Sequence, residues 1–245
     1  MSTKSRRLTV GGIAIEIVRK EIKNLHLGVY PPNGRVRVAA PKIVSDEAIR
    51  LAVIGKLAWI KRQREQFQSQ PRQSRREMVN GESHFFLGRR YRLRVHEHNG
   101  PAKVGIAGPR NLDLYVRQGT SAEQRAEILN RWQRTELRAL LTPILEQWQA
   151  TLQVRVAQWG IKKMKTKWGS CNSKAHRIWF NLELAKKPPA CIEYIVVHEL
   201  MHLKHRLHDQ AFLDAMDQHL PSWQRLRAEL NRAPLGDEVW PKAAS

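Results

Sequence analysis

The chain has 245 residues with 43 Lys and Arg against 22 Asp and Glu, so its formal net charge is +21. Its hydrophobic content of 42% is enough for a core and excludes a wholly disordered chain, and no apolar run approaches the roughly 20 residues of a membrane-spanning helix. The strongly basic surface favours an anionic partner such as a nucleic acid or a nucleotide, without choosing between them.

The N-terminal region is predicted to be rich in β structure. Apolar residues alternate along residues 7–40, and this pattern, interrupted by glycine- and proline-containing turns, predicts a β-meander with one buried face. The interruptions also make the N-terminal stretch unlike a secretory signal sequence. Ser45 followed by two acidic residues indicates a helix N-terminus. A basic stretch at 68–76 is typical of a linker, and further strands are expected between residues 85 and 116.

The remainder is predicted to be mostly helical. Ser121 and Gln124 form a capping box at the start of a long helix, which Pro143 is expected to kink or split. Strands are expected at 154–159 and 179–184. No internal repeat is visible. The remaining helical segments are expected at about 189–206, 209–219 and 222–231.

These elements indicate an α+β protein. We expect a β-rich N-terminal region over 1–119 and a second region over 120–245, as two domains or as one continuous domain. The only cysteines, Cys171 and Cys191, fit no CxxC metal or redox motif. Two reduced thiols are typical of the cytoplasm, where we expect the protein to reside.

One motif carries specific chemistry. Residues 198–202 read HELMH, an HExxH pattern that follows an apolar run with the character of a buried helix. On a helix, His198 and His202 lie about 40° apart in azimuth and one turn apart in height, so both imidazoles can reach one metal ion. Glu199 between them is too far round the helix to be a ligand but can touch a metal-bound water.

The residues alone leave the third ligand of this site open. Catalytic zinc sites usually have three protein ligands and one open position. His205 lies on the same helical face as His198 but about 10.5 Å along the axis, too far for one metal to bond both easily. His208 could return to the metal only if the helix breaks after about residue 205. Asp209 and a distant acid such as Glu229 are the other candidates.

The segment HELMHLKHRLHDQAF, 198–212, resembles the YgjP-like metallopeptidase family, also called the domain of unknown function 45 family, whose pattern is HELxHLxxxxHxxxF. Further matches are the KWGSC segment at 167–171 and the Pro and Trp at 221–223. The resemblance implies a zincin-like domain, a twisted sheet with an active-site helix and C-terminal helices. It also implies one zinc ion bound by His198, His202 and His208, with Glu199 as the catalytic acid/base. The metzincins share this histidine spacing but have Gly where this chain has His205, so the turn must be built differently here.

We therefore expect a zinc-dependent hydrolase, specifically a metallopeptidase that acts on a peptide or protein, with Glu199 accepting the proton of a zinc-activated water. Alternatives are a zinc-dependent hydrolase of a non-peptide anion such as a nucleoside triphosphate, and a basic nucleic-acid-binding protein with a structural zinc.

The strand at Arg177–Leu182 could, by analogy with zincins, receive an extended peptide. Asp209 and Asp214 are candidates to orient a histidine ligand. The candidate substrate-binding residues are Lys167, Trp168, Arg177 and Trp179.

Overall fold

The computed structural model describes residues 5–30, 34–69, 76–164 and 167–232. The chain forms two compact units, Met1–Arg72 and Gln73–Ser245, each with a hydrophobic core of its own. The boundary expected at residue 119 falls inside the second unit, and most of the expected linker at 68–76 lies outside the described residues. Among the described helices, none is both long and apolar enough to cross a membrane.

The first unit is a four-stranded sheet with two helices, and its strand order corrects the predicted meander. The order is β1-β2-β4-β3, with β2 and β4 parallel and both edge strands antiparallel to their neighbours. The central pair places Ile15 beside Val36 and Ile17 beside Val38, so the most apolar strands are neighbours at the centre of the sheet. The elements are β1 (Ser5–Val10), β2 (Ile13–Lys20), β3 (His26–Tyr30), β4 (Arg35–Pro41), α1 (Asp46–Ile54) and α2 (Leu57–Ser69).

The second unit begins with a sheet of the same topology. Its order is β5-β6-β8-β7, with β6 and β8 parallel, and a helix capped by a serine follows it, as in the first unit. The two N-cap serines, Ser45 and Ser121, are offset by 76 residues (121 minus 45), and Gly12 and Gly88, both with positive φ in the first hairpin turn, have the same offset. These elements are β5 (Ser83–Phe86), β6 (Arg89–Glu97), β7 (Lys103–Ala107), β8 (Asn111–Val116) and α3 (Ala122–Leu152).

The chain therefore contains a structural repeat that the sequence analysis missed. At the matched offset, buried Ile15 and Ile17 of the first copy correspond to buried Tyr91 and Leu93 of the second. The core position is kept while the residue type changes, because a sheet face requires apolar side chains of compatible volume rather than particular residues.

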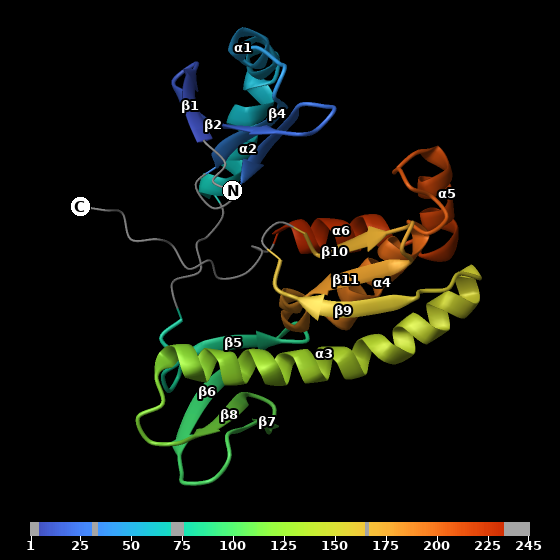
Figure 1. The fold of residues 1–245 in the computed structure, drawn as a ribbon. Coiled ribbons are helices and arrows are strands. Elements are labelled where there is room, and N and C mark those ends of the chain that lie inside the picture. The colour runs from blue at the N-terminus through green and yellow to red at the C-terminus, as the bar shows by residue number, and fades with distance from the viewer. Residues whose placement is uncertain (1–4, 31–33, 70–75, 165–166, 233–245) are drawn as a thin grey trace. The chain divides into compact units, whose positions relative to one another are not determined.

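Helix α3 runs along the second unit from the β5–β8 sheet to the strands β9 (Gln158–Lys162), β10 (Gly169–Asn172) and β11 (Arg177–Asn181) (Figure 1). It is continuous through Pro143, so the predicted split does not occur. Pro143 is exposed, whereas Leu141 and Leu145 on either side are buried in the core. Packing of this buried face on both sides of the proline compensates for the hydrogen bond that the ring removes.

The C-terminal part of this unit holds a second, three-stranded sheet and three helices. The order is β10-β11-β9, so β11 is central, with β10 antiparallel on one side and β9 parallel on the other. Strand β9 begins later than predicted, at Gln158 rather than at residue 154. The elements are β9 (Gln158–Lys162), β10 (Gly169–Asn172), β11 (Arg177–Asn181), the 3-10 helix η1 (Leu182–Lys186), α4 (Pro189–Met201), α5 (Gln210–His219) and α6 (Trp223–Arg232).

Helix α4, which carries the HExxH motif, is buried on most of its surface. It contacts α3, β10, α5 and α6, which explains why its sequence is apolar almost all the way round. The indole Nε1–H of Trp148 on α3 donates to Glu193 on α4 at 2.9 Å. The helix is thus packed on several sides, and this packing fixes the position of its last turn, which carries His198 and Glu199.

Candidate metal centre

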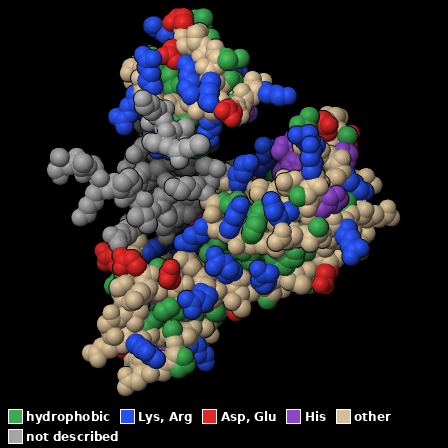
Figure 2. Space-filling model, in the orientation of Figure 1, with side chains coloured by type: hydrophobic (Ala, Val, Ile, Leu, Met, Phe, Trp, Pro, Cys, Tyr) green, Lys and Arg blue, Asp and Glu red, His purple; other side chains and the backbone are tan. Residues whose placement is uncertain are grey.

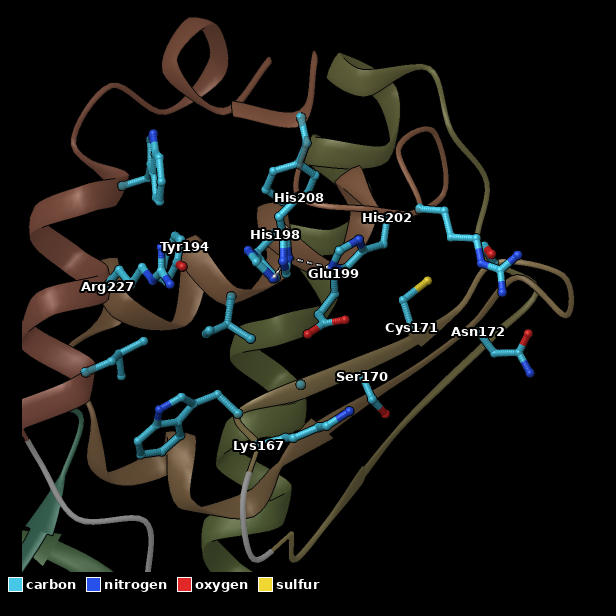
Figure 3. Close-up of a pocket in the computed structure, with 18 of the residues that line it drawn as sticks. Lys167, Ser170, Cys171, Asn172, Tyr194, His198, Glu199, His202, His208 and Arg227 are labelled. Carbon is cyan, nitrogen blue, oxygen red and sulfur yellow. Dashed lines mark hydrogen bonds between the residues drawn. The ribbon is translucent and has the colours of Figure 1, made fainter. Parts of the chain in front are cut away.

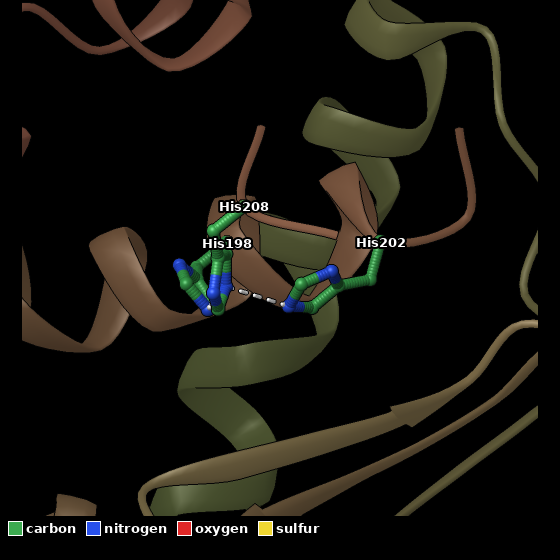
Figure 4. Close-up of side chains that lie close together, drawn as sticks. All are labelled: His198, His202 and His208. Atoms are coloured by element: carbon green, nitrogen blue, oxygen red, sulfur yellow. Dashed lines mark hydrogen bonds between the residues drawn. The ribbon is translucent and has the colours of Figure 1, made fainter. Parts of the chain in front are cut away.

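Three histidine side chains converge at the end of α4 (Figure 4). The Nε2 atom of His208 lies 3.2 Å from Nε2 of His198 and 3.1 Å from Nε2 of His202. Zinc–nitrogen bonds of about 2.0–2.1 Å in a tetrahedral site place two ligand nitrogens about 3.3 Å apart. The two separations from His208 are therefore close to the value that one tetrahedral metal ion requires, and the ligand atoms of all three histidines lie within 4.8 Å of one another. In the described residues, no other group of three His, Cys, Asp or Glu side chains has this potential.

The approach of His208 depends on how α4 ends. The helix stops at Met201, earlier than predicted, and the backbone N–H groups of Lys204 and His205 both donate to the Met201 carbonyl. His202 is the C-cap, in a right-handed conformation, and His205 is not among the described residues with positive φ. The chain therefore leaves α4 without a residue in the left-handed conformation, which is the conformation that favours glycine. It accounts for histidine at the position where metzincins have glycine.

His205 contributes its backbone to the site. The Nδ1–H of His202 donates to the His205 carbonyl at 3.0 Å, which fixes the tautomer and leaves Nε2 of His202 with a free lone pair facing the other histidines. The side chains expected in this orienting role are engaged elsewhere. Asp209 caps α5 by accepting from the Phe212 backbone N–H, and Asp214 accepts from Gln210.

Aromatic side chains hold the three imidazoles in place. The ring of Phe212 is buried, and its centroid lies 4.7–5.2 Å from the ring centroids of all three histidines. Tyr194, one turn before His198, makes an edge contact with it at 5.8 Å. Tyr194 is nearly fully buried, and it also lines the cleft that opens over the histidines.

Glu199 lies beside this group and packs against the backbone of β10 (Figure 3). A Cβ atom added to Gly169 would lie 2.5 Å from Oε1 of Glu199 and 2.7 Å from its Cγ. Only glycine leaves room for the carboxylate at this point. The glycine of the KWGSC segment thus positions the glutamate of the HExxH motif, a connection that the sequence did not reveal.

Burial shifts the pKa values of His198, His208 and Glu199. It lowers the pKa of His198 to about 3, with further lowering from His202 and His208, so this imidazole is neutral at physiological pH. Burial also lowers the pKa of His208. Burial raises the pKa of Glu199 to about 8, and the positive charge of Lys167 opposes this rise. The site therefore offers neutral imidazole nitrogens beside a carboxyl group that exchanges a proton near neutral pH.

A cleft of about 720 Å³ opens over the histidines and Glu199. Two of the four candidate substrate-binding residues, Lys167 and Trp168, line it, whereas Arg177 and Trp179 do not. The side chain of Trp179 instead packs over Gly160 on β9, with the Lys162 ammonium 4.8 Å from its ring centroid. Arg177 and Trp179 are away from the cleft because β11, which carries them, is the central strand of its sheet. The strand that contacts α4 beside the cleft is β10.

Cys171 also lines the cleft, and like Cys191 it is a free thiol. Burial raises the pKa of Cys171 to about 11, and the nearby charge of Glu199 adds to the effect. The thiol is therefore protonated at physiological pH. It lacks the thiolate that a nucleophile or a metal ligand requires.

Comparison with known proteins identifies the family. The model of the YgjP-like metallopeptidase domain matches residues 23–233. The chain belongs to this family. As a YgjP-like protein it is a metallopeptidase, and the family implies a bound metal, for which the histidine group is the candidate site.

Solved structures of metallopeptidases are similar to a smaller part of the chain. The metallopeptidase zymogen abylysin of Pyrococcus abyssi is 19% identical, with a TM-score of 0.34 over 36% of this chain and 90% of its own. The zymogen jannalysin of Methanocaldococcus jannaschii is 20% identical, with the same TM-score over 36% of this chain and 85% of its own. No curated protein matches the chain in a sequence comparison.

Proposed function

We propose that this YgjP-like protein is a zinc-dependent peptidase that binds one zinc ion through His198, His202 and His208. The observation that carries the proposal is the separation of 3.1–3.2 Å between the Nε2 atom of His208 and those of its two partners. Three imidazoles are a donor set that suits zinc, and the absence of a fourth protein ligand among the described residues matches catalytic rather than structural sites. When bound, zinc would polarise the substrate carbonyl and lower the pKa of a coordinated water.

Glu199 is the proposed general base. Its carboxylate takes the proton of the attacking water and returns it to the leaving amine, so it must exchange a proton near the working pH. Its burial, the contact with Gly169 and the charge of Lys167 support this role. Tyr194 is less suited to the role, because burial raises the pKa of its phenol to about 12 and keeps it protonated.

Strand β10 is the proposed binding edge for the substrate backbone. It pairs with β11 on one side, and no described strand pairs with its other edge. All four of its residues, Gly169–Asn172, line the cleft. An extended peptide could therefore add to this edge by backbone hydrogen bonds. This assignment replaces the expected role of Arg177–Leu182.

The test combines metal analysis with cleavage of an unfolded protein such as casein. Wild type should contain about one zinc per chain, and Glu199→Gln should keep the zinc and lose at least about 10²-fold in cleavage rate, because only the proton acceptor is removed. The double variant His198→Ala, His202→Ala should lose the metal, whereas His26→Ala, an exposed histidine of β3, should change neither property. Zinc retained by the double variant would exclude the site. Cleavage of nucleoside triphosphates but not of protein would favour the alternative hydrolase.

A further inference from the structure

The cleft above the three histidines is lined by charge of one sign. Apart from Glu199, which is buried, no acidic side chain lines it within the described part of the chain. The cationic side chains that line it come from four different segments: the residues just before β10, the turn after β10, the turn after α4, and α6. They are Lys167, Lys174, Arg206 and Arg227.

These four cations are exposed, and none lies within 4.0 Å of a carboxylate of the described residues. Some other cations of the same unit are paired with a carboxylate. Arg94 binds Asp113 at 2.6 Å, and Lys186 binds Glu183 at 2.6 Å. The positive charge of the cleft is therefore available to a ligand, and the cleft walls reduce its screening by solvent.

Two of the cations are close to the reacting groups. Arg227 acts electrostatically on His198 and His208, and Lys167 acts on Glu199. Figure 3 shows Lys167 and Arg227 on different sides of the histidine group. In Figure 2, Lys and Arg side chains lie next to His side chains on the visible face of this unit. A chain bound across the cleft would meet positive charge on both sides of the bond to be cleaved.

The aromatic side chains of the cleft favour a peptide over a nucleic acid. The Lys187 ammonium lies 5.0 Å from the ring centroid of Trp168, and the Arg227 guanidinium lies 6.0 Å from that of Trp223. One face of each ring is thus already covered by a cation, which reduces the surface on which bases could stack. Carboxylates, in contrast, need only the charge and the hydrogen-bond donors that Lys and Arg supply.

From these observations we propose that the cleft selects peptide segments rich in Asp and Glu, with Lys167 and Arg227 binding substrate carboxylates beside the scissile bond and Lys174 and Arg206 binding them farther out. This inference rests on the proposed function, because it concerns the substrate class of the same site.

Binding is measured separately from cleavage. Zinc-loaded Glu199→Gln is titrated with two labelled peptides of identical sequence, except that Asp and Glu in one are Asn and Gln in the other. The acidic peptide should bind about tenfold more tightly at about 50 mM salt, and the difference should largely disappear at about 500 mM, because the charges involved are exposed and screened. Equal affinity for the two peptides at low salt would overturn the proposal.

A matched control separates the cleft from the overall charge of the protein. In the Glu199→Gln background, Arg227→Glu combined with Arg206→Glu should remove the preference for the acidic peptide. Arg110→Glu combined with Arg90→Glu reverses two exposed charges outside the cleft lining and should preserve that preference. An equal loss in both would assign the preference to net charge and contradict the proposal. A single-stranded oligonucleotide that binds more tightly than the acidic peptide, with the same sensitivity to Arg227→Glu, would also overturn it.

Cleavage of the same peptide pair by wild type distinguishes the two proposals. If neither peptide is cleaved while the acidic one is bound preferentially, the proposed peptidase activity fails and the charge selection holds. If both are cleaved at equal rates and bound equally, the peptidase activity holds and the proposed selection of acidic segments is wrong.

Discussion

At the scale of single residues, the site depends on atoms that the motif does not name. The HExxH pattern specifies two histidines and a glutamate, but the His205 carbonyl orients His202, and the missing side chain of Gly169 makes room for Glu199. Neither contribution can be found by searching for residues with reactive side chains. One is a backbone atom, and the other is the absence of a methyl group.

Gly169→Ala tests the second contribution. The new methyl group would displace the Glu199 carboxylate, whose Oε1 would lie 2.5 Å from it. We expect cleavage to fall by about 10–100-fold while zinc content stays at the wild-type value, because a misplacement of about 1 Å is costly for a catalytic group. The control is Gly105→Ala in β7, where an added Cβ meets nothing within 4 Å. Full activity of Gly169→Ala would show that the close packing is not needed.

At the scale of elements, Asn181 at the end of β11 connects the sheet to the segment that enters the cleft. It is fully buried, and its amide donates to the carbonyls of Met164 and Lys167. Its side-chain oxygen accepts from the backbone N–H groups of Met164 and Glu183. This one side chain therefore caps η1 and also binds the backbone of Met164 and Lys167, which precede β10 in the chain.

We expect Asn181→Ala to destabilise the protein by about 1–3 kcal/mol, because it leaves backbone polar groups of Met164 and Lys167 without their partner. The measurement is urea denaturation, compared with Gln147→Ala, an exposed position on α3 where little change is expected. If the two variants were equally stable, the amide would not be holding this segment.

At the scale of the whole molecule, the two units have separate cores, and the candidate metal site lies entirely in the second. Calorimetry of the full chain should therefore show two unfolding transitions, of which one depends on the metal. A metal present at about 100 times its dissociation constant stabilises by about 2.7 kcal/mol. In a unit of this size, chelation should lower that transition by about 5–10 °C.

Ile15→Ala assigns the other transition. Ile15 is fully buried in the core of the first unit, so its truncation should lower only the transition that is insensitive to chelation. A single transition that responds to both treatments would mean that the units unfold together.

Much of the site was predictable because its information is local. The spacing of His198, Glu199 and His202 follows from the geometry of one helix turn, and the match of the 198–212 segment to the family pattern indicated His208. The capping box at Ser121 was also correct, because its hydrogen bonds join residues three apart. Errors arose where the answer depended on distant partners. Pro143 was expected to kink or split its helix, and the split does not occur because packing keeps the helix continuous. The meander was wrong because β4 lies between β2 and β3, which leaves β3 at the edge of the sheet.

The sequence by itself determined that the chain has a basic surface, an apolar helix and an HExxH motif on it, since these follow from composition and short-range spacing. Only the tertiary structure decided which strand faces the cleft, which cations gather around it, and that the two serine-capped modules share one topology. These features depend on side chains and strands that are far apart in the chain, and their proximity is set by packing of the whole unit, which no local pattern specifies.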